Sequence, residues 1–400
     1  MRSILRSKRF LARVLACAGA LGSAFIGWQV WTPETVAWTR TTLGDFSVER
    51  ADGLVLQDSH GQNLYATIGY TIYRSRAGSA FERVHEIVPP FGEPWAGYLR
   101  GVRDLLRQQE MAEVVALEDD VLVVFAGGEV HRVDLAKDKD EIVHTMRYWG
   151  RGKGRGLMPH GVTVDGDGTV FYGEYPTGHD TAGGSVRLWS SRDGGRSFQV
   201  AHEFAPGFAR HIHSVQWDPQ GHALWVATGD SDAESHIGYS TDGGASFRWI
   251  GSGSQAFRAC SLMFASDRVE WAMDSPSVPS YIMTWERSSG SIAATKPALP
   301  SPGYYTRSLG EKGALFTLAE RRAAVWLVDA AGPRELFDWP VTADASRPHP
   351  SVRLLRSYAE AETAGILLNP LRTDAESAAI YRIASTIDIA STPRTVAMRQ

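Results

Sequence analysis

Hydrophobic and polar residues alternate in short runs along most of this chain. From about Trp38 onward, runs of four to eight residues end at clusters of Gly, Asp, Asn or Ser, a pattern typical of antiparallel strands. Residues 161–175 (GVTVDGDGTVFYGEY) place Asp-Gly between two such runs, which is a strong hairpin signal. Helical periodicity is nearly absent, except over residues 98–114, where we expect a short helix. The pattern predicts an all-β protein.

A repeated segment indicates the architecture. Residues 191–198 (SRDGGRSF) recur 49 residues later as residues 240–247 (STDGGASF), each after an apolar strand. In each copy the Asp can accept hydrogen bonds from turn amides, the glycines allow positive φ, and the Phe can pack into the sheet. The repeat resembles the Asp-box, or BNR, repeat of the sialidase-like propeller superfamily. The resemblance implies a β-propeller in which each copy joins the third and fourth strands of a blade.

The repeat length predicts how many blades the chain can form. Divided by 49 residues, the chain after its N-terminal segment fits a six- or seven-bladed propeller of four-stranded antiparallel blades, with seven favoured. We expect a single propeller domain over residues 38–390. Because the two ends of a propeller normally meet to close the ring, one blade is expected to combine N- and C-terminal strands.

Residues 1–31 differ from the rest of the chain. Five cations and no acidic residue precede an apolar run, Val14–Trp31, of 18 residues. This order is typical of a secretory signal peptide. The run also has the length of an uncleaved signal-anchor helix, and a lipoprotein signal with Cys17 is a third interpretation. We expect an exported protein, periplasmic or extracellular, or anchored in the inner membrane by a tether at residues 14–31 with its body outside the cytoplasm.

The charge of the chain argues against one class of partner, and its cysteine content excludes one class of scaffold. Without the five N-terminal cations the chain keeps 36 Lys and Arg against 45 Asp and Glu, so we expect no nucleic-acid partner, which would need a broad basic face. Cys260 is the one cysteine beyond the N-terminal segment, which excludes a disulfide framework. The sequence also lacks nucleotide-binding loops and the common zinc-protease and serine-hydrolase motifs.

Candidate chemistry gathers at strand starts and loops between residues 159 and 276. Within a strand, His211 and His213 would point to the same face. The pair can supply a general base. With His160 and a carboxylate such as Glu174, it can instead bind a divalent metal. The structural alternative is that the histidines only bridge neighbouring blades.

Nearby cations suggest recognition of an acidic ligand. Arg210 and Arg258, with Gln255 close by, can hold the carboxylate of an acidic sugar. The structural alternative for Arg258 is an ion pair with Asp230 or Asp274 between blades. Glu174 also precedes Tyr175, and a carboxylate beside a phenol can activate it, as in sialidases. Adjacent strand residues point to opposite faces, however, so these two side chains should not touch.

The superfamily resemblance implies a choice of activities. Its members include sialidases, other glycoside hydrolases, lyases of acidic polysaccharides and non-catalytic binding proteins. The sialidase pattern of an F/Y-R-I-P-type segment is missing, whereas propeller lyases neutralise a uronate carboxylate with Arg or Gln and remove the C5 proton with His or Tyr. We expect an acidic glycan or polysaccharide as partner and a polysaccharide lyase or glycosidase-like activity, with a non-catalytic glycan- or protein-binding propeller as the alternative. No cofactor is expected unless the His cluster binds a divalent metal. The expected catalytic residues are His211, His213, His160 and Tyr175, and the expected substrate-binding residues are Arg210, Gln255, Arg258 and Glu174.

Overall fold

The described chain is built from β-strands and short turns. The computed structural model describes residues 32–88, 110–150, 153–177, 184–342, 349–356, 365–375 and 378–384. Within these ranges there is no α-helix, and three 3-10 helices occur: η3 (Asp232–Glu234), η4 (Gln255–Phe257) and η5 (Gly310–Lys312). The predicted all-β class is therefore confirmed for the described ranges. The predicted signal or anchor, residues 1–31, lies outside them, and no described helix is long and apolar enough to cross a membrane.

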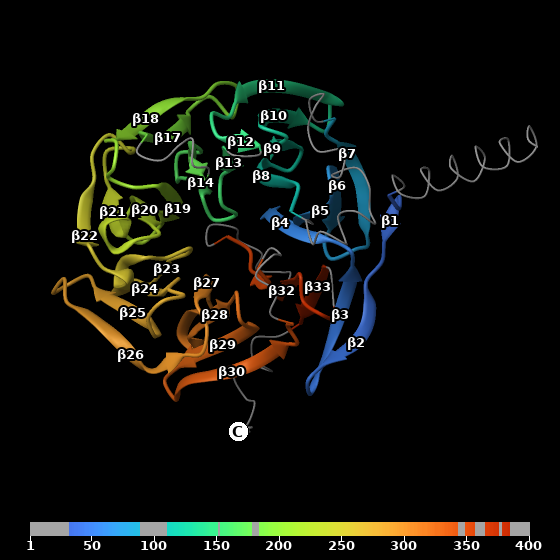
Figure 1. Ribbon diagram of the computed structural model, residues 1–400. Helices are drawn as coiled ribbons and strands as arrows, with labels where there is room; N and C mark the ends of the chain where they lie inside the picture. The colour runs from blue at the N-terminus through green and yellow to red at the C-terminus, as the bar shows by residue number, and fades with distance from the viewer. Residues whose placement is uncertain are drawn as a thin grey trace, which may run out of the picture.

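Six antiparallel sheets follow one another in chain order around a ring (Figure 1). Their main strands are β4 (Val55–His60), β5 (Asn63–Ile68), β6 (Thr71–Arg76) and β7 (Phe81–Glu86); β8 (Ala112–Glu118), β9 (Val121–Ala126), β10 (Glu129–Asp134) and β11 (Lys139–Thr145); β14 (Val162–Val164), β15 (Val170–Gly173), β17 (Val186–Ser191) and β18 (Gln199–Phe204); β19 (His211–Asp218), β20 (Ala223–Gly229), β21 (His236–Ser240) and β22 (Arg248–Ser252); β23 (Met263–Phe264), β24 (Arg268–Ala272), β25 (Ser280–Glu286) and β26 (Ile292–Leu299); β27 (Gly303–Ser308), β28 (Ala314–Leu318), β29 (Ala323–Asp329) and β30 (Gly332–Trp339). The first strand of each sheet lies nearest the centre of the ring and the last lies at its rim. This arrangement is propeller-like, and it places the inner strands of the six sheets around one central axis.

A seventh sheet joins the two ends of the described chain. It combines β31 (Ser351–Arg353), β32 (Ile366–Leu371) and β33 (Ala379–Ile383) with β3 (Phe46–Asp52) and β2 (Thr39–Leu43). The pairing of Glu49 with Arg382 places N- and C-terminal strands side by side, as predicted from ring closure. The short strand β1 (Thr35–Val36) pairs with β7 at the outer edge of the first sheet.

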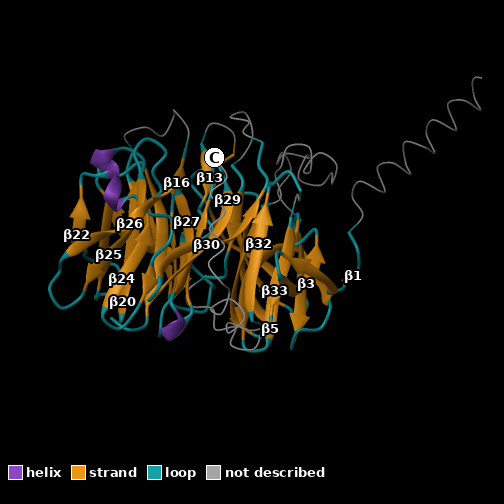
Figure 2. Cartoon of the chain, turned by 90° about the horizontal axis from the view of Figure 1, so that it is seen from below, coloured by secondary structure: helices purple, strands orange, loops and turns teal. Residues whose placement is uncertain are grey.

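A small three-stranded sheet is added to the ring. It consists of β12 (Trp149–Gly150), β13 (Gly154–Gly156) and β16 (Tyr175–Pro176). In the side view of Figure 2, β13 and β16 lie at the same face of the ring as the two short helices beside β22.

The two repeated turns have the same hydrogen bonds. Asp193, between β17 and β18, accepts hydrogen bonds from the backbone N–H groups of Arg196 and Ser197 at 2.9 and 3.0 Å. Asp242, between β21 and β22, accepts one from the backbone N–H of Ser246 at 2.9 Å. In each turn a Ser hydroxyl also accepts a hydrogen bond from a later glycine N–H, Ser191 from Gly195 at 3.0 Å and Ser240 from Gly244 at 2.8 Å. These contacts hold the turn between the third and fourth strands of each sheet in one conformation.

Apolar side chains fill the space between neighbouring sheets. Trp225 on β20 and Trp271 on β24 are no more than 1% exposed and pack in one cluster with Ile237 and Leu262. Burying a large apolar side chain contributes about 1.5–3 kcal/mol. The contacts between sheets therefore hold the inner strands, which carry the polar residues near the axis, in fixed positions.

The helix predicted over residues 98–114 is wrong where the structure describes it. Strand β8 begins at Ala112, and residues 98–109 lie outside the described ranges. Val114 packs in the cluster on one side of β8 and Val115 in the cluster on the other. A strand buried on both faces loses the apolar–polar alternation, so sequence periodicity does not identify it.

Candidate functional site

The two predicted strand histidines meet a carboxylate at the start of β19. His211 pairs with Gly229 at the end of β20, so the turn places the next residue, Asp230, beside it. The Nε2 atoms of His211 and His213 are 2.8 Å apart. Asp230 Oδ1 lies 3.3 Å from the first of these nitrogens and 3.4 Å from the second. Both imidazoles are buried, whereas 30% of the Asp230 side chain is exposed, so solvent reaches the cluster at the carboxylate.

Backbone contact determines the tautomer of His211. Its Nδ1 lies 2.9 Å from the carbonyl oxygen of Pro176, which can only accept a hydrogen bond, so Nδ1 carries the proton. In the neutral ring Nε2 is then an acceptor, and it lies 2.8 Å from His213 Nε2, which can donate a hydrogen bond to it. The Tyr175 ring stacks on His211 with ring centroids 3.9 Å apart. His211 is therefore oriented from two sides, by the Pro176 carbonyl and by the Tyr175 ring.

Arg258 and Asp274 lie behind this cluster. Arg258 Nη2 is 3.2 Å from Asp230 Oδ1, and its Nε is 3.2 Å from Asp274 Oδ2. Cys260 Sγ lies 3.4 Å from the same Asp274 oxygen and 3.9 Å from His213 Nδ1. The ion pairs that were the structural alternative for Arg258 are thus both present. This guanidinium is engaged by two carboxylates and is not free to hold a ligand.

The surroundings of the cluster shift the pKa values of its two carboxylates in opposite directions. Although burial opposes it, the two neighbouring histidines hold the pKa of Asp230 well below its usual value. Burial raises the pKa of Asp274 to about 7, against the pull of Arg258. Burial also lowers the pKa of His213 to about 4, partly offset by Asp230. Near neutral pH the site therefore holds an ionised Asp230 beside a neutral His213.

Arg210 and Gln255 surround Asp230. Arg210 Nη1 is 3.3 Å from Asp230 Oδ2, and Nη2 donates to the Thr177 carbonyl at 3.2 Å. The Arg210 side chain is 43% exposed. Gln255 Nε2 donates to the Asp230 backbone carbonyl at 2.9 Å. Of the predicted carboxylate-binding residues, Arg210 is the one that is both exposed and only partly neutralised.

His160 is not part of this cluster. Its Nδ1 is 3.1 Å from Ser261 Oγ, its Nε2 is 3.4 Å from the Leu354 carbonyl, and its ring lies on Tyr305. Burial holds its pKa well below the usual range. His160 is therefore a buried neutral histidine of the axis, and the expectation that it joins the His pair is not met.

Glu174 is not part of the His211–His213 cluster either. Its carboxylate accepts hydrogen bonds from Trp189 Nε1 and from the Arg187 backbone N–H, both at 2.9 Å, and lies 3.3 Å from Arg147 Nη1. The carboxylate beside the His pair is instead Asp230. Because Glu174 immediately precedes the short strand β16, its side chain is directed to β17, away from the partners of Tyr175.

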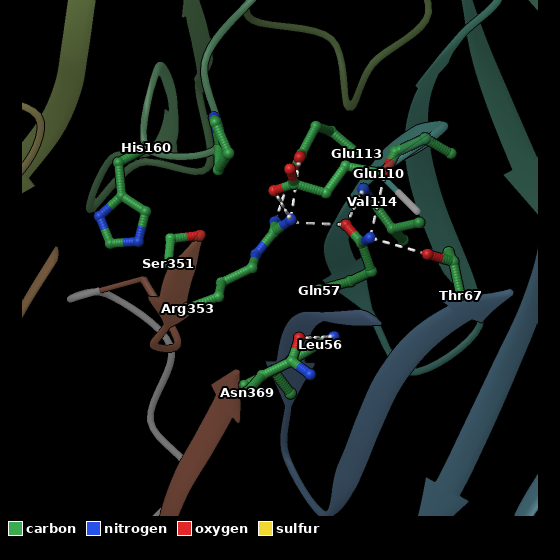
Figure 3. Close-up of polar contacts among 12 residues, drawn as sticks. Leu56, Gln57, Thr67, Glu110, Glu113, Val114, His160, Ser351, Arg353 and Asn369 are labelled. Atoms are coloured by element: carbon green, nitrogen blue, oxygen red, sulfur yellow. Dashed lines mark hydrogen bonds and ion pairs between the residues drawn. The ribbon is translucent and has the colours of Figure 1, made fainter. Parts of the chain in front are cut away.

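Near the axis, the described residues contain a buried ionic network that the sequence analysis missed. Arg353 and Arg356 are no more than 2% exposed, and both donate to the carboxylate of Glu113. Figure 3 shows Arg353 extended toward Glu113 and Gln57, with His160 nearby. Arg356 also donates to the backbone carbonyls of Gln57, Val114 and Pro159. The available signal was the segment SVRLLR, which places two cations in an apolar run. The network joins inner strands from several sheets.

The geometry of the His pair and Asp230 suits a divalent cation. The three atoms form a triangle with sides of 2.8, 3.3 and 3.4 Å. Atoms this close together could all reach one divalent cation at about 2.1 Å. A second group consists of His213 Nδ1, Cys260 and Asp274, and Arg258 contacts one carboxylate of each group at 3.2 Å. The second group is fully buried, whereas Asp230 of the first is partly exposed, so the first group is the candidate metal site.

Comparisons with known proteins support the fold. An oligogalacturonate lyase in complex with manganese is 9% identical and aligns with a TM-score of 0.57 over 88% of this chain and 97% of its own. An oligogalacturonate lyase from Vibrio parahaemolyticus is 11% identical, with a TM-score of 0.53 over 87% of this chain and 97% of its own. This chain shares their propeller-like fold. No family model and no curated protein matches the sequence.

Proposed function

We propose that this protein is an exported seven-bladed propeller that cleaves an acidic saccharide by β-elimination. In this proposal the seven sheets of four or five strands are the blades, the repeated turns are Asp boxes, and residues 1–31 direct export. The lyase names of the two structural neighbours agree with an acidic polysaccharide as substrate. Their low identity leaves the chemistry to be argued from the site itself.

The observation that carries the proposal is the orientation of His211. The Pro176 carbonyl holds its proton on Nδ1, which leaves Nε2 unprotonated beside the partly exposed Asp230. To act as the base, this nitrogen exchanges its contact with His213 Nε2 for the substrate proton. β-Elimination needs such a base to remove the C5 proton, which lies next to the uronate carboxylate. The electrons of the C–H bond form the C4–C5 double bond, and the O4 leaving group departs with the C4–O4 bond pair.

β-Elimination also needs a group that binds the uronate carboxylate and an acid that protonates the leaving oxygen, and two residues near His211 are candidates for these roles. Arg210, exposed and paired with one carboxylate oxygen, can bind the uronate carboxylate and stabilise the charge that develops on it. We assign to Tyr175, whose ring stacks on His211, the role of the acid that protonates O4. Burial raises the pKa of this phenol, which makes it a weaker acid, so the assignment rests on its position. Arg258, held by Asp230 and Asp274, positions the site instead of binding substrate.

A divalent metal would change the role of the histidines. His211 Nε2, His213 Nε2 and Asp230 Oδ1 are the residues that would hold it. When bound, such a metal supplies positive charge that neutralises a substrate carboxylate and acidifies the adjacent proton. The histidines would then orient the metal, and proton removal would fall to another group.

The test is an ultraviolet screen for unsaturated uronate with purified protein and acidic polysaccharides, beginning with oligogalacturonate. Wild type should produce the absorbing product, and His211→Ala should lower turnover by about 10²–10⁴-fold while binding persists. His60→Ala, an exposed histidine paired with Asp119 at the β4–β5 turn, is the control and should match wild type.

Three outcomes decide between the alternatives. Loss of turnover on chelation, restored by manganese, assigns the histidines as metal ligands. Unchanged turnover in both His211→Ala and His213→Ala contradicts the proposed roles. Binding of acidic glycans without any product leaves the non-catalytic binding propeller.

A further inference from the structure

A glycine-rich hairpin carries cations beside the candidate site. Strand β12 (Trp149–Gly150) pairs with β13 (Gly154–Gly156), and β13 pairs with β16 through Gly154–Pro176 and Gly156–Tyr175. A Cβ on Gly154 would lie 2.5 Å from the Tyr175 carbonyl oxygen, so only glycine allows this approach. Two cations flank Gly154 along the chain: Lys153, which is exposed, and Arg155, whose side chain is 46% exposed. The hairpin therefore brings two cations close to the strand that contains Tyr175.

Backbone hydrogen bonds connect this hairpin to the site. The Thr177 N–H donates to the Lys153 carbonyl at 3.1 Å, and the Thr177 carbonyl accepts from Arg210 Nη2 at 3.2 Å. Tyr175, two residues earlier, stacks on His211. Lys153 and Arg155 are thus fixed to the same short strand that orients the proposed base.

The two cations differ in how far they are neutralised. No ion pair is found for Lys153 among the described residues, whereas Arg155 lies 3.8 Å from the buried Glu110 carboxylate. The chain beyond residue 31 carries nine more acidic than basic residues, so a group of exposed cations is a local exception. Arg210, which bonds the same Thr177 that bonds the Lys153 carbonyl, is a third cation near this strand and pairs with Asp230. Such a group attracts an anion with several charges spaced along it.

We propose that Lys153 and Arg155 form a second carboxylate subsite, so that the substrate is a polyuronate chain and not a single acidic sugar. This inference rests on the proposed function, because it assigns Arg210 to the carboxylate of the reacting sugar. Lys153 and Arg155 then bind the carboxylate of a neighbouring sugar. An acidic protein with three local cations suits a few carboxylates, whereas nucleic acid requires a broad basic face.

The test measures binding of galacturonate and of its oligomers by calorimetry. Wild type should bind the oligomers more tightly than the single sugar. Lys153→Ala/Arg155→Gln should lower oligomer affinity by about tenfold and reduce the dependence of log K on log salt by about two, while binding of the single sugar changes less than twofold. Arg155→Lys, which retains the charge, should recover part of the loss.

A control variant and four outcomes separate the second subsite from the proposed lyase activity. Lys137→Ala/Lys139→Ala removes two exposed lysines at the β10–β11 turn and should leave oligomer binding unchanged. Equal loss for single sugar and oligomer in the hairpin variant would overturn the second subsite, as would competition by single-stranded DNA at the concentrations at which oligouronate binds. Length-dependent binding without cleavage supports the subsite and refutes the lyase. Cleavage with an unchanged KM for long chains in the hairpin variant supports the lyase and refutes the subsite.

Discussion

Replacing Glu113 by Gln tests whether the buried charges at the axis hold the ring together. The Glu113 carboxylate accepts hydrogen bonds from Arg353 Nη1 at 2.9 Å and from Arg356 Nη2 at 2.8 Å. Arg353 Nη2 donates to it as well. Glutamine has nearly the same shape, but it removes the negative charge and turns an amide N–H₂ toward guanidinium donors.

The contacts around the two arginines determine how much unfolding free energy we expect Glu113→Gln to lose. Removing one partner of a buried ion pair costs about 3–5 kcal/mol, because the other charge is left uncompensated. Here Glu110 Oε1 remains 3.6 Å from Arg353, and Asp58 Oδ2 remains 3.8 Å from Arg356. Because these carboxylates retain part of the compensation, we expect a loss near the lower limit, about 3 kcal/mol.

Equilibrium urea unfolding followed by tryptophan fluorescence measures the change. Glu203→Gln is the matched control, because its carboxylate is 43% exposed and binds Arg187 at the surface, where a pair contributes at most about 1 kcal/mol. The midpoint should fall clearly further for Glu113→Gln, with an unchanged slope. A loss below about 1 kcal/mol, or one equal to the control, would refute the claim that Glu113 neutralises buried arginines.

Two more predictions follow from neighbouring residues. Burial opposes ionisation of Glu110, but Arg372, Arg155 and Arg353 lower its pKa from the usual 4.5 to about 2. Its contribution to stability is therefore present above pH 4.5 and lost as the pH falls through about 2, so Glu110→Gln should flatten that part of a pH series of urea unfolding curves. In Gly229→Ala the new methyl would lie 2.9 Å from Arg258 Cγ and 3.1 Å from His213 Cε1. It should lower turnover or metal binding by about tenfold or more through misplacement of the His pair, whereas Gly166→Ala, 3.5 Å from Trp217, should not.

The fold could be predicted largely because its signals are local. Short alternating runs identified strands such as β10 and β20, and the 49-residue repeat located two turns between third and fourth strands. β8 was missed over residues 112–114 because apolar residues on both of its faces hide the strand period. The small sheet of β12, β13 and β16 was also missed, since its two- and three-residue strands are too short to show any period.

The site was predicted only where its residues are close in sequence. His211 and His213 share a strand, and strand geometry alone places them together. Asp230 joins them through the β19–β20 pairing, which a single sequence does not reveal. Arg353 and Glu113 are 240 residues apart, so nothing local signals their contact. His160 and Glu174 were assigned by chemical type, but other buried partners bind them.

The seventh sheet also has a consequence for the order of folding. The Leu56 N–H donates to the side chain of Asn369, a residue 313 positions later. During synthesis, β3 must therefore wait for nearly the whole chain before its partner β33 is made. Contacts of such long sequence separation form slowly, and until then the facing edges of β3 and β33 are free to pair with another chain. Refolding at high concentration should accordingly produce domain-swapped dimers, in which one chain completes the ring of another.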